Sequence, residues 1–480
     1  MSAMEFVAVT KTGIHVYDAF AKEGSIEPVT SLPAATNAEG YVSTNAEGYA
    51  WSADGAKLAT VDKGVAVVWD AAKAYKRLGE VTPSGTSGGV RALRFSPGGS
   101  FLTTYEKHDK EKCPENMQVW DLRSLPDAER LRSQAIRGYS SGAISVETIQ
   151  WTADESACLE LKPGEGLLYL DAGLRASEPR TVIPEPHAVK LHFSPKKDGD
   201  SYLVCCYMPE AAGRAAEVAI YSLGKPATAL ARLKLPSQLK DVSMTWNFDG
   251  TALLVLASSD VDPTGASYFG TTSLFWLRTD GKSVQKICGP EDGLVQDFSW
   301  SPNANEFLVI VGMLPATISL YNGKTGKHEA TFGKSRRNTV RWCPFGRFLV
   351  VGGFGALPGD VDFFDRSCQE TVCSFRAALT VNCAWAPDGR HWLACTTAPR
   401  MNEDNQVSIF HYTSARKHKI DFKPAGSGGT GKKACDAGAM LFAASWRPHT
   451  AGKFQDRPAT PREGGAKRAK GLPSEGAAVG

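Results

Sequence analysis

The chain has 480 residues, of which 42% are apolar and 22% are charged, so it contains enough apolar material to bury a core. A net charge of +3 excludes a strong overall field of either sign. We find neither a secretory signal nor the ~20 consecutive apolar residues that a membrane-spanning helix needs, which predicts a cytoplasmic protein without a membrane partner.

One phrase recurs nine times along the chain: an aromatic residue, a small or polar residue or two, a turn with Pro, Asp or Gly, and an apolar run. Its aromatic residues are Trp51, Phe95, Trp151, Phe193, Trp246, Trp300, Trp342, Trp385 and Trp446. A period near 40–50 residues with four short strands per unit is typical of a propeller blade. The sequence therefore predicts an all-β protein, a nine-bladed β-propeller over residues 1–452.

The two ends of this array each supply part of a blade. Residues 5–9 and 13–17 are strand-like but precede the first copy of the phrase, whereas the last copy, at Trp446, has no strands after it. We expect the N-terminal strands, within residues 4–33, to complete the last blade and so remove exposed sheet edges. Residues 453–480 hold six Lys or Arg against three Asp or Glu, and their Pro, Gly and charge content predicts a disordered basic tail.

Residues 294–332 illustrate one unit. Four segments of period 2 are separated by turns, and the recurrent aromatic is expected to end the first strand. The Asn322-Gly323 step predicts a tight turn with positive φ between the third and fourth strands. Third strands end in an aromatic-Asp pair at Trp69-Asp70, Trp120-Asp121 and Phe364-Asp365, which resembles the WD dipeptide of degenerate WD40 repeats.

Catalytic and metal motifs are weak throughout. Gly85 to Gly89 matches G-x-S-x-G but is followed by a strand rather than a helix, and the near P-loop at 426–433 has Lys433 where Ser or Thr is needed. The histidines lack metal-ligand spacing, and eleven scattered cysteines without a CxxC pair indicate reduced thiols. We predict a binding protein rather than an enzyme, with no cofactor or metal.

Clustered basic residues are the remaining functional candidates, because Lys and Arg on flexible segments contact phosphates with strong salt dependence. We interpret 416–419, with the Gly-rich stretch after it, as a basic flexible insertion. The candidate ribosome or RNA contacts are Lys196, Lys197, Arg336, Arg337, Arg341, Arg347, Arg416, Lys417, Lys419, Lys432, Lys433, Arg462, Lys467, Arg468 and Lys470.

Residues 337–365 read RNTVRWCPFGRFLVVGGFGALPGDVDFFD and are far more specific than a generic repeat. This stretch, hereafter the signature segment, resembles the corresponding blade of the eukaryotic translation initiation factor 2A family. It departs from the family pattern mildly, with Cys343 in place of Asn and Phe364 in place of Trp. The resemblance extends over roughly residues 40–450.

The resemblance implies a translation initiation factor that binds RNA and the small (40S) ribosomal subunit. It further implies codon-dependent, GTP-independent delivery of initiator methionyl-tRNA on selected mRNAs, with other initiation factors as partners. The family usually continues into a long charged extension, whereas only a short tail follows the propeller here, so ribosome docking carries over more safely than tRNA delivery. The alternatives are a WD40-type scaffold for protein complexes and a propeller resembling initiation factor 3 subunit b.

Overall fold

The structure is a computed structural model. It describes residues 4–21, 27–36, 48–83, 89–136, 149–162, 164–171, 180–260, 270–398, 400–401, 404–413, 416–422, 440–450 and 452–456. Nine four-stranded antiparallel sheets form a nine-bladed β-propeller, as predicted, and the chain divides into two compact units, 1–144 with 377–463 and 145–376 with 464–480. No helix among the described residues is long and apolar enough to span a membrane.

The first unit contains four sheets and a short helix, η2 (Ala71–Lys73). Its strands, sheet by sheet, are β4 (Tyr49–Trp51), β5 (Lys57–Asp62), β6 (Val65–Asp70) and β7 (Lys76–Val81); β8 (Val90–Phe95), β9 (Phe101–Glu106), β10 (Met117–Asp121) and β11 (Glu129–Gln134); β32 (Asn382–Trp385), β33 (His391–Thr396), β34 (Gln406–His411) and β35 (Arg416–Asp421); and β36 (Leu441–Trp446), β1 (Glu5–Thr10), β2 (Ile14–Asp18) and β3 (Thr30–Leu32).

The second unit contains five sheets and the short helix η3 (Pro290–Asp292). Its strands are β12 (Ile149–Trp151), β13 (Ala157–Lys162), β14 (Gly166–Asp171) and β15 (Arg180–Ile183); β16 (Lys190–Asp198), β17 (Ser201–Met208), β18 (Glu217–Ser222) and β19 (Ala231–Lys234); β20 (Asp241–Trp246), β21 (Ala252–Ser259), β22 (Thr271–Arg278) and β23 (Val284–Cys288); β24 (Val295–Trp300), β25 (Glu306–Val311), β26 (Ala316–Asn322) and β27 (His328–Ser335); and β28 (Thr339–Trp342), β29 (Phe348–Gly352), β30 (Asp360–Asp365) and β31 (Glu370–Arg376).

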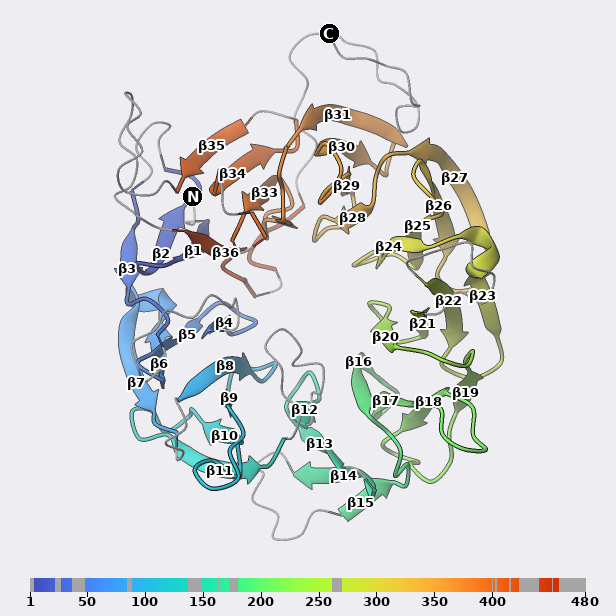
Figure 1. The fold of residues 1–480 in the computed structure, drawn as a ribbon, viewed down its shortest axis with the longest axis horizontal. Coiled ribbons are helices and arrows are strands. Elements are labelled where there is room, and N and C mark those ends of the chain that lie inside the picture. The colour runs from blue at the N-terminus through green and yellow to red at the C-terminus, as the bar shows by residue number, and fades with distance from the viewer. Residues whose placement is uncertain are drawn as a thin grey trace. The chain divides into compact units, whose positions relative to one another are not determined.

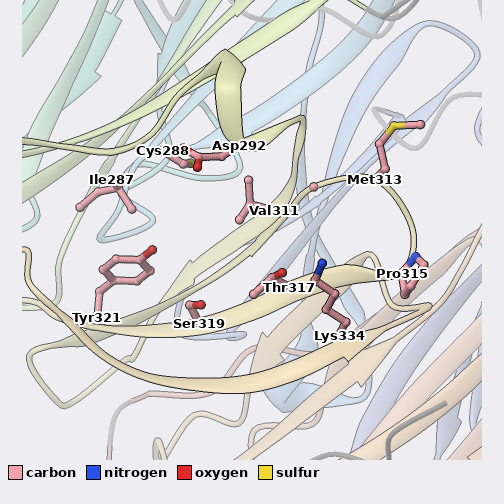
Figure 2. A pocket seen from close by; sticks show the side chains of 11 residues that line it. Ile287, Cys288, Asp292, Val311, Met313, Pro315, Thr317, Ser319, Tyr321 and Lys334 are labelled. Atoms are coloured by element: carbon pink, nitrogen blue, oxygen red, sulfur yellow. The ribbon is translucent and has the colours of Figure 1, made fainter. Parts of the chain in front are cut away.

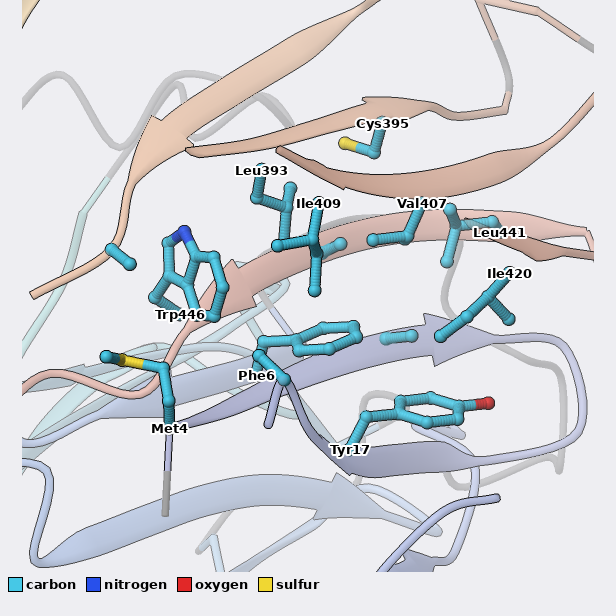
Figure 3. Close-up of a cluster of buried hydrophobic side chains, with 14 of the residues drawn as sticks. Met4, Phe6, Tyr17, Leu393, Cys395, Val407, Ile409, Ile420, Leu441 and Trp446 are labelled. Atoms are coloured by element: carbon cyan, nitrogen blue, oxygen red, sulfur yellow. The ribbon is translucent and has the colours of Figure 1, made fainter. Parts of the chain in front are cut away.

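The N-terminal strands complete the last sheet, as the sequence predicts. β36 pairs antiparallel with β1, so that Phe6 faces Trp446 across the two strands, and Figure 1 shows the dark red β36 beside the blue β1. The Phe6 ring stacks on Tyr17 at 5.3 Å between centroids and meets Trp446 edge-on at 5.7 Å. Figure 3 shows these rings against Leu393 and Ile409 of the sheet β32–β35, so the joined strands share one apolar core with the preceding sheet.

The recurrent aromatic has a structural role in each repeat. It is the last residue of the first strand in every copy except Phe193, whose strand β16 continues to Asp198. Indole nitrogens also donate hydrogen bonds to the preceding sheet. Each acceptor is the carbonyl oxygen of the residue just before that sheet's own aromatic: Trp246 to His192, Trp300 to Thr245, Trp342 to Ser299 and Trp446 to Ala384, at 3.0–3.3 Å. The repeat therefore marks a hydrogen-bonded joint between successive sheets.

The turn at Asn322-Gly323 differs from the prediction. Gly323 does not have positive φ; Gly326, three residues later, has φ +69°. The Asn322 side-chain oxygen accepts hydrogen bonds from the backbone N–H groups of Lys324 and Thr325, which opens a longer loop in place of a two-residue turn. The hydrogen bonds to the Asn322 side chain therefore favour a loop longer than the predicted two-residue turn.

Candidate functional site

The signature segment forms β28, β29 and β30 and the turns that join them. Two of its glycines are required by close approach. A Cβ on Gly346, which has φ +69°, would lie 2.0 Å from Oδ1 of Asn303, and a Cβ on Gly353 would lie 2.4 Å from the carbonyl oxygen of Arg336. These positions explain part of the signature as packing between neighbouring loops.

Arg337 lies just before β28 and is held in a buried ion pair. Its Nε and Nη2 donate to Oδ2 of Asp362 at 2.9 and 2.8 Å, and only 12% of its side chain and 1% of that of Asp362 are exposed. Asp362 also accepts a 2.6 Å hydrogen bond from Ser374, while Asp360 lies 3.6 Å from Nη1. The guanidinium is therefore engaged in joining the start of β28 to β30 and β31.

Arg341, on β28, pairs with Asp297 on β24 of the preceding sheet. The same Asp297 oxygen accepts a 2.9 Å hydrogen bond from the backbone N–H of Val340. Burial raises the pKa of Asp297 and outweighs the opposing effect of the Arg341 charge. Arg341 therefore compensates a carboxylate that is largely removed from water, although nearly half of its own side chain is exposed.

Arg347 lies in the turn after β28 and pairs with Asp365 at the end of β30, at 3.2 Å. Its guanidinium also lies over the Phe348 ring, with 5.2 Å between the guanidinium carbon and the ring centroid. Burial raises the pKa of Asp365, but hydrogen bonds from Ser367 and Arg347 outweigh it and hold the pKa below its usual value. Asp365 is the aromatic-Asp position of this repeat, so the residue that resembles the WD dipeptide anchors a turn.

The four arginines predicted as contacts in this segment and just before it do not converge on one patch. Arg336 is exposed and Arg337 half-buried, and both precede β28, whereas Arg347 follows it, at the opposite end of the same sheet. Sequence reasoning missed Arg366, whose Nε and Nη2 lie 2.9–3.3 Å from Glu306 and tie this sheet to the preceding one. The ribosomal contacts predicted for Arg336, Arg337, Arg341 and Arg347 stay predictions. In the structure Arg337, Arg341 and Arg347 each form an ion pair with an Asp.

Lys196 and Lys197 lie at the end of β16 and are exposed. Lys196 lies over the Phe248 ring at 5.1 Å, and Lys197 pairs with Asp154 at 3.0 Å. The hydrogen bond that Lys197 donates to the Asp154 carboxylate raises the pKa of Lys197, so this ammonium stays charged at neutral pH.

The interpretation of residues 416–419 as a flexible insertion is wrong, because Arg416–Asp421 forms β35. The alternation that makes it a strand is visible in the side chains: Arg416, Lys417 and Lys419 are exposed, while His418 is buried against the sheet. Lys419 pairs with Asp421 at 2.7 Å. The other candidates, Lys432, Lys433, Arg462, Lys467, Arg468 and Lys470, lie outside the described residues.

No group of three or more potential metal ligands gathers among the residues that the structure places. The cysteines that the structure describes form no disulfide, and burial raises the pKa of Cys395 to about 12, as expected of an unreactive core thiol. The near match at 85–89 to a hydrolase motif and the near P-loop at 426–433 fall almost wholly outside the described ranges. The described basic residues are thus a set of charged side chains around a rigid scaffold, suited to binding.

Comparisons with known proteins agree with the family resemblance of the signature segment. The family model described as "Eukaryotic translation initiation factor eIF2A" matches residues 237–424, which include the whole segment. A eukaryotic translation initiation factor 2A from Dictyostelium discoideum is 28% identical over 78% of this chain and 59% of its own length. The Drosophila melanogaster protein of the same name is 30% identical over 68% of this chain and 51% of its own length.

A solved structure described as "Crystal structure of the eukaryotic initiation factor" supports the fold. It superposes with a TM-score of 0.74 at 23% identity, covering 94% of this chain and all of that one. The chain spans between a half and three fifths of the length of the two curated relatives that it matches.

Proposed function

The chain belongs to the eukaryotic translation initiation factor 2A family, and on that premise we propose that it binds the small ribosomal subunit. The observation that carries the proposal is the match of the family model to residues 237–424, with the signature segment inside it. We further propose, as the finer part, that the bound protein promotes GTP-independent delivery of initiator methionyl-tRNA on selected mRNAs in the cytoplasm. This finer part concerns an activity of the whole protein, and the match covers only 59% and 51% of the length of the two relatives.

The mechanism we propose is binding rather than catalysis. Exposed Lys and Arg side chains held on rigid strands contact phosphates of ribosomal RNA, which favours binding without reading base sequence. Arg416 and Lys417 are the best placed of the predicted contacts in the first unit, because both are exposed and neighbour each other on β35. In the second unit Arg336 and Lys196 are exposed predicted contacts as well.

Co-sedimentation with purified small subunits over a salt series tests the proposal. We expect binding at low salt that weakens steeply as salt rises. The double variant Arg416→Glu/Lys417→Glu should reduce the slope of log K against log salt by about two, one for each phosphate contact removed. Lys324→Glu/Lys327→Glu is the matched control, since both lysines are exposed in a loop that we do not assign to the interface. A chain that stays unbound at low salt would refute ribosome binding.

The delivery step needs a separate measurement. Filter binding of labelled initiator methionyl-tRNA to small subunits, with an AUG-containing message and GTP omitted, should retain more tRNA when the protein is added. Retention that does not rise above the level without protein removes the delivery function and leaves ribosome binding standing.

A basic tail is predicted to add RNA affinity. Phe454 packs against the core shared by β36 and β32–β35, and Asp456 pairs with Arg390 at 3.2 Å, so these contacts continue past the predicted domain boundary at 452. Truncation after Asp456 therefore tests the tail better than truncation after residue 452. We expect weaker RNA association at an unchanged melting temperature, and an unchanged RNA affinity would contradict the prediction.

A further inference from the structure

Two consecutive sheets of the second unit carry the same side-chain pattern on their third strands. β22 presents Thr271, Ser273 and Phe275, and β26 presents Thr317, Ser319 and Tyr321. Residues two apart in a strand share one face, so each strand places two hydroxyls and an aromatic ring in one row, in which the central serine is buried. Each row forms one wall of a groove, which we name the β22 groove and the β26 groove.

The β26 groove has a volume of about 400 Å³ and the β22 groove about 280 Å³. Figure 2 shows Tyr321, Ser319 and Thr317 in a row along β26, with Lys334 beside Thr317 and with Ile287 and Cys288 opposite. Lys334 is the register partner of Thr317 on β27, which places its ammonium at one end of the row.

The two grooves differ in their charged and apolar groups. Lys286 of the β22 groove is ion-paired with Glu291 at 2.7 Å, whereas Lys334 takes part in no ion pair among the described residues. Met313, which lines the β26 groove, is 78% exposed, and its neighbour Leu314 is 40% exposed. Large exposed apolar side chains beside a groove mark protein interaction sites, and Met adapts well to varied partners.

We propose that the β26 groove binds an extended peptide segment of a partner protein, with an acidic side chain on Lys334 and an apolar side chain on Met313 and Leu314. An extended peptide repeats its side chains every two residues, which is the spacing of Thr317, Ser319 and Tyr321 along this wall of the groove. The Lys334 ammonium supplies charge complementarity to the acidic side chain. The Met313 and Leu314 side chains supply apolar surface that binding removes from water.

The groove favours a peptide over a nucleic acid strand. It contains the Asp292 carboxylate, which accepts a 2.9 Å hydrogen bond from the backbone N–H of Gly289 and which repels phosphates. It presents one ammonium rather than a row of basic side chains, and the largely exposed Met313 adds a thioether. Both features suit one acidic side chain flanked by apolar residues. This inference stands independently of ribosome binding.

A displayed library of random octapeptides, selected in parallel on the full chain and on variants, tests the inference. We expect sequences enriched on the wild type to carry Asp or Glu two residues from Leu, Ile, Met or Phe. Lys334→Ala and Met313→Ser should lose this enrichment, whereas Lys286→Ala, the matched lysine of the β22 groove, should keep it. No enrichment, or enrichment that survives Lys334→Ala, overturns the proposal.

Fluorescence anisotropy of an enriched peptide gives the magnitude. Lys334→Ala should weaken binding about threefold to fivefold, as loss of one partly screened ion pair does, and Lys334→Glu should weaken it further. A fluorescein-labelled uridine dodecamer is the competing probe. If the dodecamer binds in a Lys334-dependent way and displaces the peptide, the groove is a nucleic-acid site and the peptide proposal fails.

Discussion

The sheets β24–β27 and β28–β31 pack against each other in the second unit but differ in how their basic side chains are paired. In β28–β31 the arginines of the signature segment are paired with carboxylates, and the most buried of these pairs exposes 12% of Arg337 and 1% of Asp362. In β24–β27 Lys334 has no ion pair among the described residues, and Met313 is largely exposed. The segment that identifies the family therefore contributes mostly to folding, while the less distinctive neighbour offers the accessible groups.

Arg337→Ala should give the largest effect and tests whether the signature arginines are structural. Removing the guanidinium leaves the buried Asp362 charge uncompensated, which we expect to lower the free energy of unfolding by about 3–5 kcal/mol. Urea denaturation measures the loss. Arg376→Ala is the control, because Arg376 is 63% exposed in its pair with Asp360 and should cost less than about 1 kcal/mol. Equal losses in the two variants would contradict a structural role for Arg337.

Glu306→Ala tests the link between the two sheets and should have the next largest effect. Glu306 accepts hydrogen bonds from both Nε and Nη2 of Arg366, and both side chains are mostly buried. We expect a loss of about 1.5–3 kcal/mol, the range of hydrogen bonds to charged groups. Glu291→Ala, which breaks the exposed pair with Lys286, serves as the comparison and should lower stability far less in the same denaturation experiment.

Asp365 should make part of this sheet's stability depend on pH. Its pKa in the folded protein lies below the usual value, despite burial, because Ser367 and Arg347 donate hydrogen bonds to the carboxylate. A lowered pKa means that the stabilisation is present above the unfolded pKa of about 4 and is lost as pH falls through the folded value. The stability difference between wild type and Asp365→Asn should therefore be constant from pH 7 to pH 5 and shrink in more acidic buffer. A difference that does not change with pH would rule out this ionisation as its source.

Lys334→Ala should have the smallest effect on stability and so sharpens the contrast between the sheets. The side chain is exposed and unpaired among described residues, so we expect a change within about 0.5 kcal/mol. Leu320→Ala, a buried position on β26, should by contrast cost about 2–5 kcal/mol. If Lys334→Ala unfolds at the same urea concentration as the wild type yet binds the peptide more weakly, stability and binding reside in different groups of the same sheet.

The fold was predictable because the repeat is local. An aromatic that ends a strand and a turn that follows it are encoded within a few residues, and the copies repeat the signal. Phe193 shows the limit of that signal, since the following residues continue the strand to Asp198. The prediction for the basic run at 416–419 was wrong because its charges suggested a loop. In the structure His418 is buried between two exposed lysines, as in a strand.

The ion pairs and the β26 groove could not be predicted from the sequence. The partners of Arg337, Arg341 and Arg366 are 25, 44 and 60 residues away, so only the packing of the strands shows which carboxylate meets which guanidinium. Lys334 and Lys286 look alike as exposed strand residues in the sequence. They differ in the structure because Lys286 donates a hydrogen bond to Glu291, whereas Lys334 has no ion pair among the described residues.

The pairing of β1 with β36 has a consequence for synthesis of the chain. β1 is buried at all six positions, yet its partner residues 441–446 are made more than 400 residues later. At a translation rate of about 5–20 residues per second, β1 waits about 20–90 s before its second neighbour, β36, exists. A nascent chain therefore carries an apolar strand edge that must be shielded from aggregation, and a circular permutant with β36 placed directly before β1 would shorten that interval to a few seconds.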